Sequence, residues 1–431
     1  MAYDLRPTYD PTREGLGILT TTPSSGLRLA GIEGTRAIAA GSILVYHVWL
    51  YSSPEGGAFE LGRIGMMVPD LQYGVALFFV LSGFLLYWPF AAGILREGSG
   101  PRRRAYLRNR ALRIVPAYWA ILFLCALVLG AVLRPDGTSG TLRDPVALLE
   151  SMLFVQNYGP DQVVTGIGPA WSLNVEVVFY VLLPVLAIAA AAIAGASRSI
   201  GAALAPAAAL LAVGLAGKAI AAYAVPPSAP FNGWEHNWHS VLERSFLVQA
   251  DLFAFGMALA VVRVLWEDGR FGLPAWWRPT VGIGALVVLA LVTTRATNSG
   301  EQLSYSPWNT VVALCLAALL ALVVLAEPRA RTLPFLVRAL EWQPLAAVGV
   351  VSYSVFLWHE PLVRWLQAHG LTFSGPAGFL ANVVIVFAVT LVLSIATYRL
   401  IEAPSLRLKA RSRMPRPTEP AITHAEATAA P

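Results

Sequence analysis

Charged residues are scarce in this chain. Only 13% of its 431 residues are Asp, Glu, Lys or Arg, whereas 56% are hydrophobic, a balance far from that of a soluble domain. It has only two cysteines, Cys125 and Cys315, each within an apolar run, so no disulfide framework is predicted. Walker A loops, dinucleotide fingerprints, His-Glu-x-x-His pairs and Gly-x-Ser-x-Gly elbows are also absent from the sequence. These absences argue against the common nucleotide-binding, zinc-protease and serine-hydrolase classes.

Long apolar runs are what the chain has in abundance. Mean hydropathy is +0.61, and the runs are long enough to cross a bilayer as helices. The segment 134–168 contains an apolar patch that is too short to span, and we expect it to lie at the membrane interface or to re-enter. The sequence predicts an all-α, polytopic membrane bundle of about ten transmembrane helices, at residues 30–51, 70–95, 111–133, 169–194, 200–223, 242–266, 279–297, 307–327, 344–368 and 377–402.

Arginine placement predicts the orientation of this bundle. Of the Lys and Arg residues in loops and tails, about 22 fall on one side and about 6 on the other, and the richer side is expected to be cytoplasmic. The same pattern accounts for the net charge of +6 without nucleic acid as a partner. Both termini are then cytoplasmic, in a multi-pass protein of the plasma (inner) membrane. Residues 1–28 form an N-terminal tail, 29–405 the transmembrane domain, and 406–431 a disordered tail.

Arg36 and His47 share one face of the first predicted span. Eleven helical steps bring them to nearly the same direction, about 16 Å apart along the axis. Glu33 lies one turn before Arg36 on that face. Charged and titratable side chains inside a span are costly unless they face a protein interior or a wet cavity. The stripe therefore indicates a functional site, in which His47 is the candidate general base.

Two arginines, Arg110 and Arg113, lie where the third span leaves the cytoplasmic side. They are three residues apart and share a helix face. The planar guanidinium fork suits phosphate, so they are candidates for anion binding beyond their role in topology. The neighbouring Arg102, Arg103 and Arg104 are better explained as positive-inside charges.

The fourth span begins with a polar stripe. Ser172, Glu176 and Tyr180 recur at four-residue spacing after Trp171. Because this span runs inward, Glu176 is expected near the depth of His47, where a carboxylate can orient an imidazole or bind a polar acceptor. A helix-packing hydrogen bond is the alternative role for this carboxylate.

The ninth span carries a second intramembrane histidine. Ser352 and His359 are seven residues apart and share a face, with Tyr353 beside them. His359 is either a satisfied core histidine or a member of the site. Glu402, two residues before Pro404, ends the tenth span, and we expect it to pair with an arginine of the 96–113 loop. The stretch 235–239 has two histidines and one Glu, which is a poor metal signal, and no metal site is predicted.

Together these motifs resemble the acyltransferase-3 family of bacterial integral membrane O-acyltransferases. The resemblance runs from Leu29 to Pro404. It comprises an Arg-x10-His motif, a Gly-x-x-Leu-Phe-Phe-Val-Leu-Ser-Gly-Phe block, an Arg-x-x-Arg-Ile-x-Pro-x-Tyr-Trp block, a Trp-Ser-Leu-x-x-Glu block, a Ser-Tyr-x-x-Phe-Leu-x-His-x-Pro block and a final Glu-x-Pro. They begin in turn at Arg36, Gly74, Arg110, Trp171, Ser352 and Glu402. Departures are Glu33 in place of Asp, Thr35 in place of Leu, and Val177 in place of a second carboxylate.

The resemblance implies transfer of an acyl group, most often acetyl, from cytoplasmic acyl-coenzyme A to a hydroxyl group. The acceptor would be a sugar, a cell-surface glycan such as a polysaccharide, or a secondary metabolite, and the sequence does not choose among them. His47 would be the base, with Arg36, Glu176 and His359 in the catalytic group. Arg110 and Arg113 would bind the donor. The expected substrate or oxyanion contacts are Ser352, Tyr353, Trp171 and Ser172.

Two other classes are compatible with buried polar residues in a membrane bundle. A transporter of a lipid-linked or polar substrate would move its cargo without consuming acyl-coenzyme A, although no inverted repeat is visible in the sequence. A sensor descended from the enzymes would bind the donor without turnover. The presence of both Arg36 and His47 favours the enzyme.

Overall fold

The computed structural model describes residues 29–65, 67–96, 101–195, 197, 199–225, 235–299, 306–326 and 333–411. The predicted N-terminal tail, 1–28, lies outside the described residues. So does most of the predicted C-terminal tail, but residues 406–411 belong to a helix, α16 (Ala403–Arg411).

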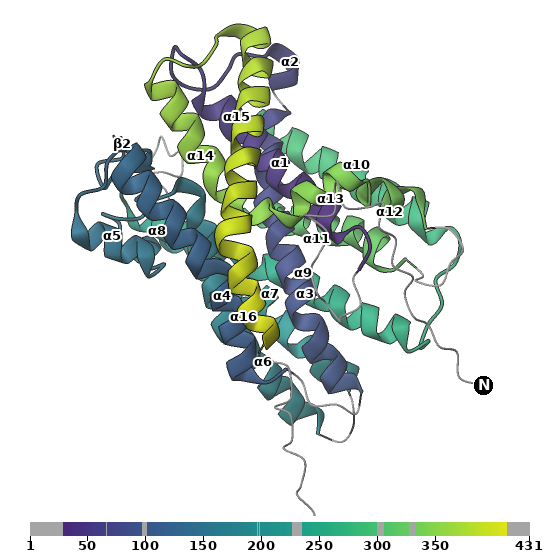
Figure 1. The fold of residues 1–431 in the computed structure, drawn as a ribbon. Helices are drawn as coiled ribbons and strands as arrows, with labels where there is room; N and C mark the ends of the chain where they lie inside the picture. Colours follow the sequence, from purple (N-terminus) through teal and green to yellow (C-terminus); the bar gives the residue numbers. More distant parts are fainter. Residues whose placement is uncertain are drawn as a thin grey trace, which may run out of the picture.

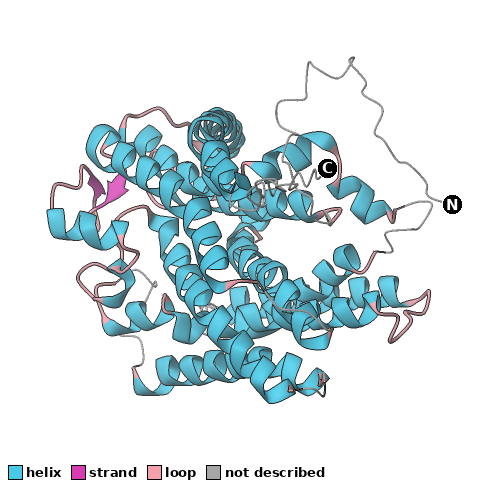
Figure 2. Ribbon diagram, turned by 60° about the horizontal axis from the view of Figure 1, so that its bottom comes forward, coloured by secondary structure: helices cyan, strands magenta, loops and turns pink. Residues whose placement is uncertain are grey.

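Helices make up most of the described chain (Figure 2). The first seven are α1 (Ile32–Tyr51), α2 (Gly62–Gly65), α3 (Gly74–Leu95), α4 (Arg103–Phe123), α5 (Pro145–Met152), α6 (Trp171–Ala194) and α7 (Ile200–Ala219). The next eight are α8 (Trp238–Glu243), α9 (Phe246–Glu267), α10 (Trp277–Ser299), α11 (Pro307–Val324), α12 (Phe335–Leu340), α13 (Gln343–Val350), α14 (Ser352–Ala368) and α15 (Gly375–Thr397).

Short turns of tighter or wider helix extend these elements. The tighter turns are η3 (Val68–Tyr73), η5 (Gln156–Tyr158) and η6 (Gly168–Ala170), and the π-helical turns are η4 (Leu124–Leu129), η7 (Ile220–Ala224) and η8 (Tyr398–Glu402). Strands β1 (Val132–Leu133) and β2 (Ser139–Gly140) pair antiparallel, with Val132 opposite Gly140. The segment 134–168 contains β2, α5 and η5, and no candidate span begins and ends within it.

Most of the predicted spans are confirmed as long apolar helices. Within the described ranges, eight helical segments are long and apolar enough to cross a membrane, and α13 with α14 makes a ninth if the pair is one span. The predicted continuous span 344–368 is wrong in detail, because α13 and α14 meet at a bend of 75°. The bend lets α13 lie against α1, where Gly349 packs on the backbone of Glu33.

The first predicted span, α1, is not among these candidate spans. Polar residues along it, including Glu33, Arg36 and His47, lower its hydropathy. It packs instead as an interior helix, in contact with α3, α13, α14 and α15 (Figure 1). The fold is therefore a helical membrane bundle with eight or nine candidate spans in the part described, and the count of ten is not confirmed.

The loops gather at two ends of the bundle (Figure 1). At one end, which we call the arginine-rich end, Arg96 contacts Asp268, and the amide of Gly31 donates to Glu341 over 2.6 Å. At the opposite end, Asn382 donates to Ser52, and Arg364 donates to Ser139 of the hairpin. These contacts group the loops in the same alternation that the arginine count gives.

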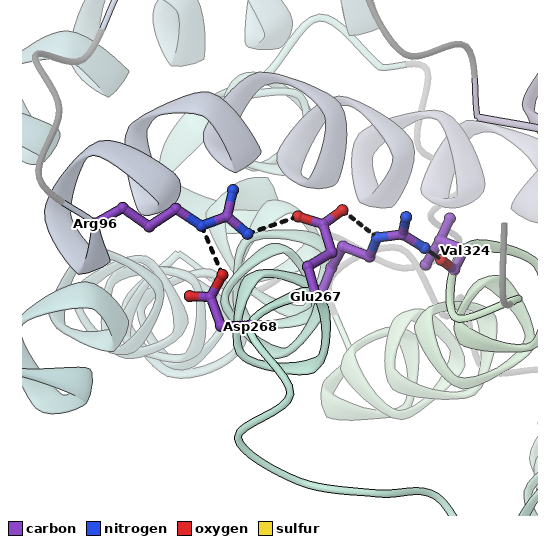
Figure 3. Close-up of polar contacts among 5 residues, drawn as sticks. Arg96, Glu267, Asp268 and Val324 are labelled. Atoms are coloured by element: carbon purple, nitrogen blue, oxygen red, sulfur yellow. Dashed lines mark hydrogen bonds and ion pairs between the residues drawn. The ribbon is translucent and has the colours of Figure 1, made fainter. Parts of the chain in front are cut away.

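A network of ion pairs fastens helices at the arginine-rich end (Figure 3). Arg96, just after α3, contacts Glu267 at 2.9 Å and Asp268 at 2.8 Å. Oε1 of Glu267 also accepts a 2.6 Å hydrogen bond from Nε of Arg263, and Arg263 donates to the carbonyl of Val324 at the end of α11. Three helices, α3, α9 and α11, are thereby tied together at their ends.

The core forms where α3 and α9 lie in close contact. Gly83 of α3 and Gly256 of α9 each face backbone of the other helix, where a Cβ would collide. Small residues allow membrane helices to approach this closely. Phe253 then stacks on Phe79 at 4.7 Å and on Phe179 of α6 at 4.2 Å between ring centroids. These rings pack α3, α6 and α9 against one another.

Candidate active site

His47 and His359 meet in the interior of the bundle. Nδ1 of His47, on α1, lies 2.8 Å from Nε2 of His359, on α14. His359 is fully buried, and only 9% of His47 is exposed. The two histidines that the sequence places in separate spans therefore form one hydrogen-bonded pair, 312 residues apart in the chain.

The backbone of α14 assigns the protons in this pair. Nδ1 of His359 lies 3.1 Å from the carbonyl oxygen of Val355, and a carbonyl can only accept, so this nitrogen must carry a hydrogen. Nε2 of neutral His359 is then an acceptor, and Nδ1 of His47 is the donor to it. The remaining nitrogen of His47, Nε2, is left with a lone pair, which is the state that a general base requires.

Aromatic rings hold His47 in place from the other side. The ring of Tyr51, one turn later on α1, lies parallel to that of His47, with 5.7 Å between centroids and 8° between planes. Tyr46 approaches it at a tilt, at 5.1 Å. The imidazole is thereby fixed in position and orientation before any substrate arrives.

Arg36 lies in a second polar cluster, nearer the arginine-rich end. Its Nη1 is 3.4 Å from Oε2 of Glu33, and it also interacts electrostatically with Glu402, Glu176 and Arg113. Glu402 is 3% exposed and accepts a 2.5 Å hydrogen bond from Ser354. The expected pairing of Glu402 with an arginine of the 96–113 loop is consistent with its electrostatic attraction to Arg113.

The π turn η8 explains how Glu402 reaches this cluster. Pro404 has no N–H, so it cannot make the regular bond to the carbonyl four residues earlier. The chain widens into a π turn just before it, a local change that often occurs at functional sites. The Glu-x-Pro motif thus combines a carboxylate with the backbone irregularity that turns it inward.

Glu176 contacts α3 rather than the histidine pair. Its Oε1 accepts a short hydrogen bond from Ser82, a residue of the Leu-Ser-Gly-Phe sequence in α3. Tyr180, one turn later, interacts electrostatically with Glu176 and with Arg110. In this structure the partner of His47 is His359, and the expected contact between Glu176 and His47 is not among the described hydrogen bonds.

Arg110 lies beside two aromatic rings. Its guanidinium carbon is 6.0 Å from the ring centroid of Tyr106 and equally far from that of Tyr180. Its Nε is buried and has no hydrogen-bond partner within the described part of the chain. Arg110 therefore retains donor capacity, whereas the charge of Arg113 is attracted by Glu402 and repelled by Arg36.

The other predicted site residues divide into occupied and unoccupied donors. The hydroxyl of Tyr353 donates to the carbonyl of Ile114 at 2.9 Å, and that of Ser172 donates to Pro169 at 3.0 Å. Trp171 packs edge-on against Phe79. Ser352 is fully buried at the first position of α14, and its Oγ has no partner among the described residues. Of the three oxyanion candidates Ser352, Tyr353 and His359, only Ser352 keeps an uncommitted proton.

The sequence analysis missed several residues of the site. Ser354 holds Glu402, and Tyr51 stacks on His47. Glu360 and Arg364 form an ion pair one helical turn apart on α14, beside Tyr51. Spacing could have found them, because Tyr51 is four residues from His47 and Glu360 adjoins His359. Within the described ranges, no group of three or more His, Cys, Asp or Glu residues is arranged to hold a metal ion.

Comparison with known proteins places this chain among acyltransferases. A family model described as an acyltransferase domain matches residues 29–399. The putative peptidoglycan O-acetyltransferase YrhL of Bacillus subtilis is 23% identical, in a match that covers 87% of this chain and 54% of the relative. The peptidoglycan O-acetyltransferase OatA of Listeria monocytogenes is 22% identical, in a match that covers 89% of this chain and 57% of the relative.

A shorter match is to the acyltransferase MdmB of Streptomyces mycarofaciens, 24% identical over 38% of this chain and 40% of the relative. The chain thus spans only about half the length of these curated relatives. No solved structure gives a significant match.

Proposed function

The chain belongs to the acyltransferase family described by this model, and from this premise we propose that it is a membrane O-acyltransferase. It would move an acyl group, most often acetyl, from acyl-coenzyme A to a hydroxyl of a sugar, cell-surface glycan or secondary metabolite. The observation that carries the proposal is the hydrogen bond between His47 and His359, because it leaves Nε2 of His47 as a proton acceptor.

In the proposed reaction His47 acts as general base on the acceptor. Nε2 takes the hydroxyl proton while the acceptor oxygen attacks the thioester carbonyl carbon. The new C–O bond gives a tetrahedral oxyanion, which the hydroxyl of Ser352 would stabilise as a donor. When the C–S bond breaks, the proton on His47 passes to the departing thiolate. His359 accepts the bond from Nδ1–H throughout and so stabilises the imidazolium that forms.

The proposed donor site lies toward the arginine-rich end. Arg110 and Arg113 would bind coenzyme A phosphates, and the unpartnered Nε of Arg110 supports this role. Arg36, bound to Glu33 and close to Glu402, would fix α1 relative to α14, with His47 farther along α1. Glu176, bound to Ser82, would align α6 with α3. With the arginine-rich end in the cytoplasm, the donor enters from the cytoplasmic side of the plasma membrane.

The proposed acceptor is a hydroxyl-bearing glycan or small molecule. Two of the relatives are named as peptidoglycan O-acetyltransferases, which supports a glycan of the cell envelope. The first hydroxyl compounds to assay are therefore soluble peptidoglycan oligosaccharides.

Purified protein in lipid nanodiscs, supplied with labelled acetyl-coenzyme A and such oligosaccharides, tests the proposal. His47→Ala should lower transfer about 10²- to 10⁴-fold, the usual contribution of a positioned base. His369→Ala is the matched control, because His369 is exposed and stacks on Trp365 outside the site. Near wild-type transfer by His47→Ala would exclude His47 as the base. Vesicle uptake of labelled oligosaccharide without consumption of donor would instead identify a transporter.

A further inference from the structure

An ion pair, Glu360 with Arg364, lies next to the histidine pair, on the side that faces away from the arginine-rich end. Glu360 directly follows His359 on α14, and its Oε1 is bound by Nε of Arg364 one turn later. The guanidinium of Arg364 lies 3.9 Å from the ring centroid of Tyr51, and that ring stacks on His47. The pair is therefore linked through a single aromatic ring to the proposed base.

One oxygen of this carboxylate has no partner. Glu360 is 1% exposed, and its Oε2 makes no hydrogen bond within the described part of the chain. A buried carboxylate oxygen without a hydrogen-bond donor costs free energy. Across from it lies Gly168, at the start of the turn before α6, where even a Cβ would contact the carboxylate. Backbone alone faces the carboxylate there.

The location of the pair matches the direction from which an acceptor must come. Arg364 reaches Ser139 in the hairpin at the opposite end of the bundle, with 3.4 Å between Nη1 and Oγ. If the donor enters from the arginine-rich end, a second substrate meets the donor at His47 from this other side. On this side Tyr51 stacks on the base, Arg364 contacts Tyr51, and Glu360 pairs with Arg364.

We infer that Oε2 of Glu360 accepts a hydrogen bond from a second hydroxyl of the acceptor, next to the hydroxyl that reacts. Arg364 holds the carboxylate through its ion pair, and Tyr51 lies between this pair and His47. The acceptor is thereby assigned to neutral polyols and sugars with neighbouring hydroxyls. A carboxylate discriminates in this way because its oxygens accept from hydroxyl groups and repel anionic ones. The inference rests on the proposed function and specifies its acceptor.

The test compares enzyme variants with acceptor variants. The donor is labelled acetyl-coenzyme A, and the acceptors are the β-methyl glycoside of N-acetylglucosamine and its monodeoxy analogues, with the protein in nanodiscs. For wild type, at least one analogue that keeps the reacting hydroxyl should lose about 10- to 100-fold in kcat/KM, the usual worth of one charge-assisted hydrogen bond. Glu360→Gln should lower kcat/KM for the parent glycoside by a similar factor, with the donor KM unchanged. For the deoxy analogue, the same variant should have nearly the kcat/KM of wild type.

Glu267→Gln is the matched control, since Glu267 also pairs with an arginine one turn away on its helix, but at the arginine-rich end (Figure 3). It should leave acceptor kcat/KM unchanged. If Glu360→Gln fails to insert, Glu360→Asp keeps the charge one methylene back and should show an intermediate preference for the parent.

The outcomes separate this inference from the proposed function. If Glu360→Gln keeps the full wild-type preference for the parent over the analogue, the assignment of Glu360 is wrong. Wild-type protein that consumes donor in a His47-dependent way but acetylates none of the glycosides overturns the acceptor class and leaves the function standing. Transfer that survives His47→Ala overturns the function itself, whatever Glu360 does.

Discussion

Nζ of Lys218 on α7 lies 2.5 Å from Oδ1 of Asp251 on α9, and both side chains are almost completely buried. The same ammonium donates to the carbonyl of Val248 at 2.9 Å, and Oδ2 of Asp251 accepts from Thr310 of α11 at 2.5 Å. Three spans are thus joined by one satisfied polar network away from the histidine pair.

This ion pair should matter for stability and not for chemistry. Lys218→Met leaves a buried carboxylate without its cation, which costs about 3–5 kcal/mol in other proteins. We expect a clear loss of thermal stability in detergent, with activity per folded molecule unchanged. The double variant Lys218→Met with Asp251→Leu should recover much of the loss, because no uncompensated charge is left buried. A double variant less stable than Lys218→Met would contradict this account.

The hydrogen bond from His47 to His359 predicts a graded response to substitution. His359→Ala removes the acceptor for Nδ1–H and should lower kcat about 10- to 100-fold, as loss of an orienting partner does at comparable sites. His359→Gln offers an amide oxygen near the position of Nε2 and should recover part of that loss. Steady-state kinetics with saturating donor measures both. Equal losses in the two variants would indicate a packing role for His359 alone.

Two glycines of α1 give a matched test of how closely this helix is packed. A Cβ at Gly34 would collide with the carbonyl of Leu340, whereas a Cβ at Gly41 has no atom within 4 Å. Alanine is favoured over glycine in a helix by about 1 kcal/mol. Gly41→Ala should therefore leave the melting temperature unchanged or raise it, and Gly34→Ala should lower it or reduce insertion. Equal melting temperatures for the two variants would contradict the close packing of α1 at Gly34.

Hydropathy predicts most of this fold because it is a local property of each segment. Nine of the ten predicted spans coincide with candidate spans or with the bent pair, and the loops gather at two ends as the arginine count implies. The bend between α13 and α14 has no such local signal. It depends on close packing of Gly349 against α1, a contact that hydropathy does not register. The remaining predicted span, α1, is not among the candidate spans, because Glu33, Arg36 and His47 lower its hydropathy.

Pairings between helices are what the sequence could not supply. His47 and His359 lie in two separate predicted spans, and the sequence alone does not say that these two helices touch. Lys218 and Asp251 lie in neighbouring spans of the chain, yet without helix rotation neither had an assignable partner. Glu176 illustrates the converse, because its depth suggested a contact with His47 and helix rotation directs it to Ser82.

Arg110 and Arg113 lead to the prediction that most directly tests the donor site. Each Arg→Ala change should weaken acyl-coenzyme A binding by about 1.5–3 kcal/mol, the worth of charge-assisted hydrogen bonds to phosphate. Lysine should rescue only partly, because it lacks the planar fork. The signature is a raised donor KM, with turnover at saturating donor less affected.

Arg104→Ala is the control for Arg110 and Arg113, since Arg104 is exposed on the same helix. Arg110→Ala gives the cleaner reading of the pair. Its Nε has no partner among the described residues, whereas loss of Arg113 also removes a cation near Glu402. Arg113→Ala is therefore expected to add a positioning defect to the weaker donor binding. If it instead abolished turnover while donor affinity measured by calorimetry stayed intact, these arginines would be determinants of topology or helix packing, and the donor would bind elsewhere.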